Sequence, residues 1–494
     1  MTKNLHIDTQ AMRAKILDLA IQGKLTDQRA EDGNAQDLLK EIQAEKEKLI
    51  QEQQIKKEKP LPEIEADEIP FEIPKNWMWA RWGTLSISIK YGYNTSAQKD
   101  GKIKMVRISD IQNNQVNWDS VPFCNIPKEE ITQYLLRKND ILFARTGGTV
   151  GKSYLVSEVP ENVVYAGYLI RTRYSEKLSP QYLKYFMESD LYWSQLKKGT
   201  TTTAQPNCNA KTLGKMVLPL PPLAEQKRIA DKVATLFAQL DAIDKAYEEY
   251  RELQQTMKAK LLDLAMQGKL TDQRKEDGNA RDLFNDIQKE KQRLIAEKKI
   301  KKEKPLPEIE ADEIPFEIPT NWMWARLGDI VSKTIKRGKS PKYSITGDVL
   351  VFAQKCNTKP GRINLELAKK LDLSTLKKYP EEEFMLSGDI VINSTGNGTM
   401  GRVGFFRDKD NPYNLKIVPD SHVTTIRVLH DLIDSQYIFY FLKKLQPKLE
   451  SSGDGSTNQK ELKATIIASI CIPLPPLDEQ KRIVAKLDEL LPLL

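Results

Sequence analysis

Apolar residues recur every three or four positions through the middle of the chain, from about residue 225 to residue 267. They keep this spacing over five heptads, with Gln254 as the one polar exception: Ile229, Val233, Leu236, Leu240, Ile243, Tyr247, Tyr250, Met257, Leu261 and Leu264. The pattern predicts a long helix that packs along a partner helix. Pro222 before it and Gly268 after it are typical of a helix start and a left-handed cap. The helix would extend for roughly 54 Å, which favours a rod between two domains over a core helix of one domain.

Both ends of the chain contain pieces of the same pattern. Residues 12–23 repeat residues 257–268, and residues 483–494 repeat residues 229–240. We therefore expect two antiparallel helical rods, one continuous and one assembled from the two termini, which close the chain into a pseudo-twofold ring. The terminal pieces contain no counterpart of residues 243–254. Either the second rod is shorter or the gene product is a shortened form.

A second repeat is nearly identical in its two copies. The segment IKKEKPLPEIEADEIPFEIP occupies residues 55–74 and again 300–319, and each copy is followed by NWMWAR. Its prolines exclude a regular helix or a central strand, so we expect an extended strap along the scaffold. The tryptophans of NWMWAR are interpreted as packing anchors rather than base-stacking platforms. Before the first strap we expect helices over residues 12–22 and 35–57.

Two blocks, residues 82–217 and 327–471, differ in most residues but share landmarks in the same order. Both contain a short apolar run, a glycine-rich turn (146–152 and 395–402) and a final L/I-P-L-P-P-L phrase. The patterns predict strands at 104–108, 140–143 and 163–172 with a helix at 180–196, and strands at 349–353, 389–392 and 421–428 with a helix at 435–445. The predicted class is α+β, with two homologous mixed domains. The chain would divide into 1–81 (helices and strap), 82–217, 218–326 (central helix and strap), 327–471 and 472–494 (final helix).

Positive charge is concentrated in these two blocks. Residues 82–217 hold 18 Lys and Arg against 11 Asp and Glu, and residues 327–471 hold 22 against 16, in a chain of net charge +8. The rest of the chain is therefore acidic. Two basic blocks on an acidic scaffold indicate a polyanion that is contacted at two places.

Several classes of protein are disfavoured by composition. Four widely spaced cysteines and three histidines argue against a disulfide framework and against a metal centre. The sequence lacks a long apolar run and a signal peptide, so we expect a cytoplasmic protein without a membrane span.

The first glycine-rich turn, TGGTVGKS at residues 146–153, resembles a nucleotide-binding loop. That motif requires glycine where Thr146 stands, and the second copy has neither the lysine nor the hydroxyl residue. The turn could hold a DNA phosphate through its backbone N–H groups and Lys152 or Arg402, or it could be only a tight turn. No catalytic constellation stands out, so we expect no catalysis by this chain.

Polar segments beside these turns are the candidates for base and phosphate contacts, with solvated loops as the alternative. Arg and Lys suit guanine, and Asn and Gln suit adenine. The candidates in the first block are Lys102, Lys104, Arg107, Arg145, Thr146, Lys152, Lys197, Lys198, Thr203, Gln205 and Asn207. Those in the second block are Lys333, Lys336, Arg337, Lys339, Arg402, Ser456, Thr457, Asn458, Gln459 and Lys460.

The combination of motifs resembles the specificity subunit of type I restriction–modification enzymes. The phrases L-P-P-L-x-E-Q-K-R-I at 220–229 and 474–483, A-K-I/L-L-D-L-A at 14–20 and 259–265, and G-D-I-V-I-N-S-T-G at 388–396 are similar to that family. The resemblance implies two target recognition domains that each read one half of a split double-stranded DNA site. It also implies two methyltransferase partners that methylate adenine with S-adenosylmethionine, and restriction subunits that use ATP and Mg. This chain would bind none of these cofactors itself. The alternatives are the recognition half of another restriction–methylation enzyme and a coiled-coil scaffold that does not bind DNA.

Overall fold

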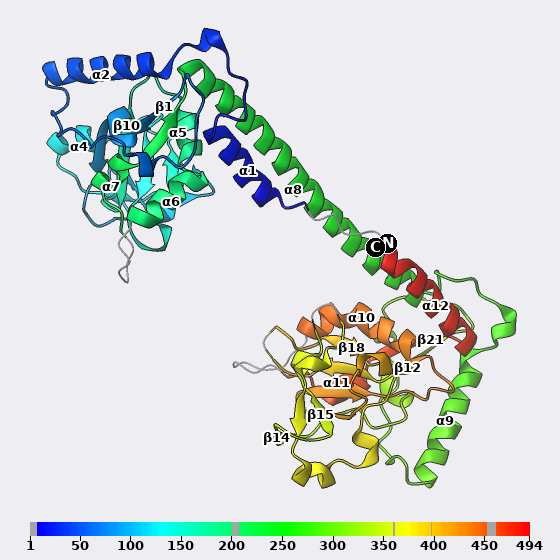
Figure 1. Ribbon diagram of the computed structural model, residues 1–494. Helices are drawn as coiled ribbons and strands as arrows, with labels where there is room; N and C mark the ends of the chain where they lie inside the picture. The colour runs from blue at the N-terminus through cyan, green and yellow to red at the C-terminus, as the bar shows by residue number, and fades with distance from the viewer. Residues whose placement is uncertain (1–6, 200–206, 359–360, 397, 452–460) are drawn as a thin grey trace. The chain divides into compact units, whose positions relative to one another are not determined.

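The computed structural model describes residues 7–199, 207–358, 361–396, 398–451 and 461–494 (Figure 1). Within these residues the chain forms two compact units, 7–248 and 249–494. Each unit contains one domain of mixed helices and strands, and the long helix α8 (Leu223–Met266) contributes residues to both units.

An antiparallel four-stranded sheet lies at the centre of the first domain, in the order β2 (Ser86–Tyr91), β10 (Leu169–Tyr174), β7 (Ile141–Ala144) and β8 (Ser153–Leu155). A second sheet has the order β6 (Phe123–Cys124), β3 (Ile103–Val106) and β9 (Val163–Tyr165), and β4 (Ile111–Gln112) forms a hairpin with β5 (Gln115–Val116). The helices are α3 (Trp82–Leu85), α4 (Lys128–Tyr134), α5 (Pro180–Phe186), α6 (Asp190–Gly199) and α7 (Ala210–Lys215). Apolar side chains of the central sheet pack against α5 and α6 in one buried cluster.

The second domain repeats this arrangement. Its central antiparallel sheet has the order β13 (Lys336–Arg337), β20 (Val423–Ile426), β17 (Ile390–Asn393) and β18 (Val403–Phe405). A second sheet has the order β14 (Tyr343–Ser344), β16 (Lys369–Leu371), β15 (Val349–Phe352) and β19 (Lys416–Pro419). The helices are α10 (Ser435–Ser451) and α11 (Ala464–Ala468). The predicted class, a mixed fold that occurs twice, is confirmed.

Each domain is closed by a pair of strands from its two ends. β1 (Met78–Arg81) pairs with β11 (Val217–Leu220), and β12 (Met323–Arg326) pairs with β21 (Cys471–Leu474). The chain therefore enters and leaves each domain at one place.

Most predicted strands and helices are present, but several limits were wrong. The run 163–172 is two strands in different sheets, because the chain turns at residues 166–168 between β9 and β10. The helix predicted over 180–196 is α5 and α6, because the buried hydroxyl of Ser189 caps the second helix by accepting from the N–H of Tyr192, 3.4 Å away. The helix predicted over 35–57 is α2 (Ala35–Gln51), and the chain leaves the helix at Gln53, whose φ is +59°.

Helix α8 has the predicted length, but its apolar seam is not buried throughout. Ile229 and Val233 near its start are fully buried, whereas Ile243, Tyr250 and Met257 are 36%, 52% and 45% exposed. The start is covered by the antiparallel helix α1 (Thr9–Ile21; Figure 1). The end belongs to a buried cluster shared with α12 (Leu477–Leu490). The prediction of five continuously packed heptads is therefore wrong in the middle of the helix, and Ile243 and Tyr250 lie in the segment for which the terminal pieces have no counterpart.

Both Pro-rich straps are extended apart from one 3₁₀ turn each, Ala66–Glu68 and Ala311–Glu313, and each is held by an arginine. Arg81 is buried and donates to the Glu68 carboxylate at 2.6 Å and to the carbonyl oxygens of Pro62, Glu63 and Lys215. Arg326 makes the matching contacts in the second unit, with Glu313 at 2.6 Å. A guanidinium has five N–H donors in a fixed plane and can reach all of these acceptors, whereas a lysine has only three donors on one nitrogen.

The tryptophans that follow the straps are packing anchors, as predicted. The buried indole of Trp77 donates to Glu225 of α8 at 2.7 Å, and that of Trp322 donates to Glu479 of α12 at 2.8 Å. The neighbouring indoles of Trp79 and Trp324 pack on phenylalanine rings of the straps.

We expect the second of these anchors to make stability depend on pH. Burial raises the pKa of Glu479, against the opposing effect of the hydrogen bonds from Trp322 and Gln273. A carboxyl whose folded pKa is raised binds more protons in the folded than in the unfolded state, so its contribution to stability falls as pH rises above about 4.5. Glu479→Gln imitates the protonated acid and removes this dependence. Its free energy of unfolding relative to the wild type should therefore rise between pH 4.5 and pH 7, measured by denaturant titration. A constant difference would contradict the assignment.

Candidate nucleic-acid interface

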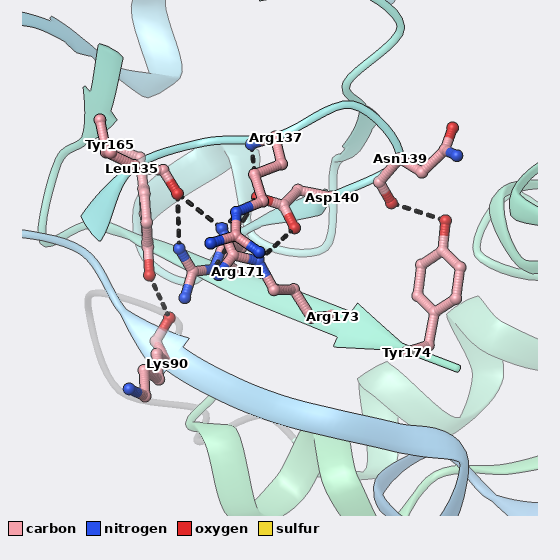
Figure 2. A network of polar contacts seen from close by, with 9 residues as sticks. All are labelled: Lys90, Leu135, Arg137, Asn139, Asp140, Tyr165, Arg171, Arg173 and Tyr174. Atoms are coloured by element: carbon pink, nitrogen blue, oxygen red, sulfur yellow. Dashed lines mark hydrogen bonds and ion pairs between the residues drawn. The ribbon is translucent and has the colours of Figure 1, made fainter. Parts of the chain in front are cut away.

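A buried carboxylate fixes one end of the central strands in each domain. Asp140 precedes β7 and accepts from the guanidinium of Arg173 at 2.8 and 3.1 Å, and Arg171 lies beside it (Figure 2). Both arginines also donate to the carbonyl oxygen of Leu135. Burial lowers the pKa of Arg171. Because every partner in this network is internal, it serves the fold rather than a ligand.

The second domain has an equivalent buried Asp–Arg ion pair. Asp389 precedes β17 and accepts from Arg427 at 2.7 Å through each of its oxygens, and Arg427 also donates to the carbonyl of Phe384 at 2.6 Å. The opposite ends of β7 and β17 lead into the glycine-rich turns. Those ends are therefore held on a rigid base, which suits a binding surface.

The glycine-rich turns are partly explained by packing. Gly151 has a φ of +91°, and a Cβ there would lie 2.1 Å from Leu196 of α6, so no other residue fits. The N–H groups of Val150, Gly151 and Lys152 already donate to backbone carbonyls at 3.1, 2.9 and 3.0 Å. A phosphate cradle built from these three groups is therefore excluded. A Cβ on Gly147 or Gly148 would meet nothing within 4 Å, so the tip of the turn is open.

Apart from Arg145, the candidate cations of the first domain fall into two groups. Lys104 donates to the carbonyl of Trp118, and Arg107 is held by Asp110 at 2.7 and 3.0 Å, which raises the pKa of Arg107. The exposed group is Lys102, Lys152, Lys197 and Lys198. No partner for these four ammonium groups is found among the described residues, so this second group is better placed for phosphate contacts.

The cations proposed for the second domain are largely engaged within it. Lys333 is 7% exposed and donates to the carbonyl of Glu382 at 2.9 Å, and burial lowers its pKa to about 8. Lys336 and Lys339 lie 2.6 and 3.7 Å from the buried carboxylate of Glu383. Lys333 is thus part of the interior, and the prediction that it contacts DNA is wrong. From the sequence, Lys333, Lys336 and Lys339 were expected to form a basic surface cluster. The sequence does not show that all three lie near the buried carboxylate of Glu383.

Two further cations of the second domain contact the chain near the turn. Arg337 pairs with Glu461 at 3.0 Å, and Arg402 donates to the carbonyl of Asn357 at 2.8 Å. Seven other candidates lie outside the described residues: Thr203, Gln205, Ser456, Thr457, Asn458, Gln459 and Lys460. Asn207 is described and forms a β-bridge with Thr146, beside Arg145.

A cleft of about 490 Å³ in the first domain was not anticipated. It lies between the β4–β5 hairpin, the glycine-rich turn and helices α5 and α6, and Lys152 and Trp193 line it. Asn113 and Asn114 at the hairpin tip have φ values of +51° and +56°, and Asn114 donates to Glu188 at 3.0 Å. The Asn-Asn pair between apolar Ile111 and Val116 was a usable hairpin signal.

Metal and membrane sites have no support in the described residues. Among them no group of three or more His, Cys, Asp and Glu side chains could hold a metal ion. No helix in the described part of the chain is long and apolar enough to cross a membrane.

Each of the two domains is matched by the same family model, the type I restriction modification DNA specificity domain, over residues 89–250 and 319–492. These ranges cover well over half of the chain. The chain belongs to the type I restriction–modification specificity family. The structural repeat and the sequence repeat thus coincide in two copies of one domain type.

Known proteins resemble the chain along most of its length. The Type I restriction enzyme EcoEI specificity subunit of Escherichia coli is 26% identical, and the alignment covers 97% of this chain and 88% of the relative. The MjaVIII specificity subunit of Methanocaldococcus jannaschii is 27% identical over 74% of each chain. A chain solved in work on complex assembly and conformational transition of the type I R-M system has a TM-score of 0.52 at 21% identity, covering 85% of this chain and 91% of that one. This last likeness supports the fold alone.

We predict that the exposed lysines at the end of α6 contribute to DNA affinity through phosphate contacts. Each phosphate contact contributes roughly 0.9 to the slope of log affinity against log salt concentration. The double variant Lys197→Ala, Lys198→Ala should therefore lower the slope by about 2 and weaken binding to all sequences about equally. The slope is measured by fluorescence anisotropy from 50 to about 200 mM salt.

Lys333→Met is the matched control, because it also removes a lysine but from a buried position. Its salt slope should equal that of the wild type. An unchanged slope in the double variant, or a reduced slope in the control, would contradict the placement of the phosphate contacts.

Proposed function

We propose that this chain is the sequence-specific DNA-binding subunit of a type I restriction–modification complex. The observation that carries this proposal is the double match of a DNA specificity family to two structurally repeated domains with different side chains. Two domains of one fold can read two different half-sites, since the scaffold supplies the position and the variable side chains supply base contacts. The concentration of positive charge in the same two blocks supports this.

In this proposal the chain recognises the DNA sequence and acts as the scaffold of the complex, and its partner subunits catalyse the reactions. Two methyltransferase subunits would bind S-adenosylmethionine and methylate adenine, and restriction subunits would use ATP and Mg. The chain itself would bind no cofactor and catalyse no reaction. It would act in the cytoplasm, where these subunits and the DNA meet.

Exchange of one block tests the proposal. Replacing residues 82–217 with the corresponding block of another specificity subunit should change one half of the methylated motif and leave the other half as it was. The motif is read by mapping methylated adenines across the host genome. The physical reason is that each block is closed on itself by its own strand pair, β1–β11 or β12–β21.

The reciprocal exchange of residues 327–471 is the matched control and should change only the other half. If either exchange alters both halves, the domains do not read independently. If deletion of the gene leaves the methylation pattern intact, the chain is not the specificity subunit of the complex.

A further inference from the structure

The two domains share a backbone frame next to the glycine-rich turns. Thr146 forms a β-bridge with Asn207, and Thr395 forms the same bridge with Glu461. On one side the N–H of Cys208 donates to the carbonyl of Arg145 at 2.9 Å, as Leu462 does to Ser394 at 2.8 Å. These bonds align positions 145 and 207 of the first domain with positions 394 and 461 of the second.

Two more positions are aligned by the central sheet. The N–H of Arg145 donates to the carbonyl of Tyr168 at 3.1 Å, and that of Ser394 donates to His422 at 2.8 Å. At the edge of the sheet, Ile170 pairs with Tyr91 as Thr424 pairs with Arg337. The shared frame therefore has four equivalent positions: Tyr91, Arg145, Tyr168 and Asn207 in the first domain, and Arg337, Ser394, His422 and Glu461 in the second.

The side chains at all four positions differ, although the frame is the same. Thr146 and Thr395 match each other, and so do the buried Asp–Arg ion pairs at the far end of the strands. The four equivalent positions, by contrast, exchange Tyr for Arg, Arg for Ser, Tyr for His and Asn for Glu. A frame that held phosphate would keep its cations in place, because phosphate is the same along every sequence. The exchange of polar groups on a fixed frame is what reading two different base sequences requires.

Several side chains of the frame lie at the surface, and some of them contact a neighbour, whereas Ser394 is fully buried and its hydroxyl lies 2.6 Å from that of Thr424. Tyr168 is 63% exposed, and the guanidinium of Arg145 lies 4.7 Å from the centre of the Tyr91 ring. In the second domain His422 is exposed and its Nδ1 lies 2.7 Å from the hydroxyl of Thr395. Arg337 pairs with Glu461 at 3.0 Å, and both side chains are about two-fifths exposed. Such mutual support holds polar groups in place for a ligand.

We propose that these side chains, apart from the buried Ser394, are base-reading positions, four in the first domain and three in the second; this rests on the proposed function. Arg145 and Arg337 present donors suited to the O6 and N7 atoms of guanine, and the Asn207 amide suits adenine. Glu461 accepts hydrogen bonds and suits the amino group of cytosine. Tyr168 and His422 stand at one equivalent position in the two domains, so each contributes to one half-site.

The test enriches bound sequences from a pool of duplex DNA with randomised bases, using the full chain. Tyr168→Ala should relax the base preference at one or two positions of one half-site, and His422→Ala should do so in the other half-site. A lost base contact corresponds to about a 10-fold loss of preference at that position. The half-site read by the unaltered domain serves as an internal check in each variant.

His430→Ala is the control, because His430 is also exposed but follows β20, whereas His422 precedes it. It should leave the enriched motif unchanged. Tyr168→His, which installs the residue of the second domain, should change the preferred base rather than abolish enrichment. If Tyr168→Ala binds no DNA, the base preference of Tyr168→His tests the inference in its place.

The outcomes separate this inference from the proposed function. If the wild-type chain enriches no motif, the proposed function fails. If the wild type enriches a two-part motif and both Tyr168 variants and His422→Ala enrich the same motif, this inference alone fails. The same holds if the variants weaken binding to every sequence equally.

Discussion

The rest of each unit depends on a set of buried hydrogen bonds that joins the strap, the strand after it and a helix, and we call this set the clamp. In the first unit the indole of Trp77 donates to Glu225. The guanidinium of Arg81 donates both to Glu68 of the strap and to the carbonyl of Lys215 at the end of the domain. Both side chains are buried, so their polar groups must be satisfied internally. The clamp joins three segments that are distant in the sequence, and it sets where the recognition block begins and ends. Its near-identical copy in the second unit explains why the strap and its NWMWAR sequel are repeated almost unchanged.

Within each domain, stability and variability lie at opposite ends of the same strands. The Asp140 and Asp389 networks hold one end of the central sheet through buried ion pairs, and breaking such a pair would leave a buried charge without its partner. The glycine-rich turns and the shared frame lie at the other end, where side chains such as Tyr168 and His422 are exposed. This separation lets the surface residues change without loss of the base that supports them.

The candidate site combines residues that the sequence suggested with residues that only the fold brings to it. Arg145, Asn207 and Arg337 were selected for their chemistry, and the structure places each of them on the shared frame of its domain. Tyr91, Tyr168, His422 and Glu461 were not among the residues selected from the sequence, because strand register brings them to the frame from distant parts of the chain. Lys333 was selected wrongly, because a lysine in a polar run gives no sign that Glu382 offers it a buried carbonyl acceptor.

The sequence by itself determined the long helix, the straps, the repeated mixed domain and the family. The heptad spacing, the prolines and the repeated segments that indicate them can each be read within a short stretch of the chain. It also identified the segment of α8 without a matching partner sequence. Only the tertiary structure decided which residues share a surface. Pairings such as Ile170 with Tyr91, and Thr146 with Asn207, join strands and loops that are far apart in the chain. Such pairings follow from long-range packing and register, which no local pattern encodes.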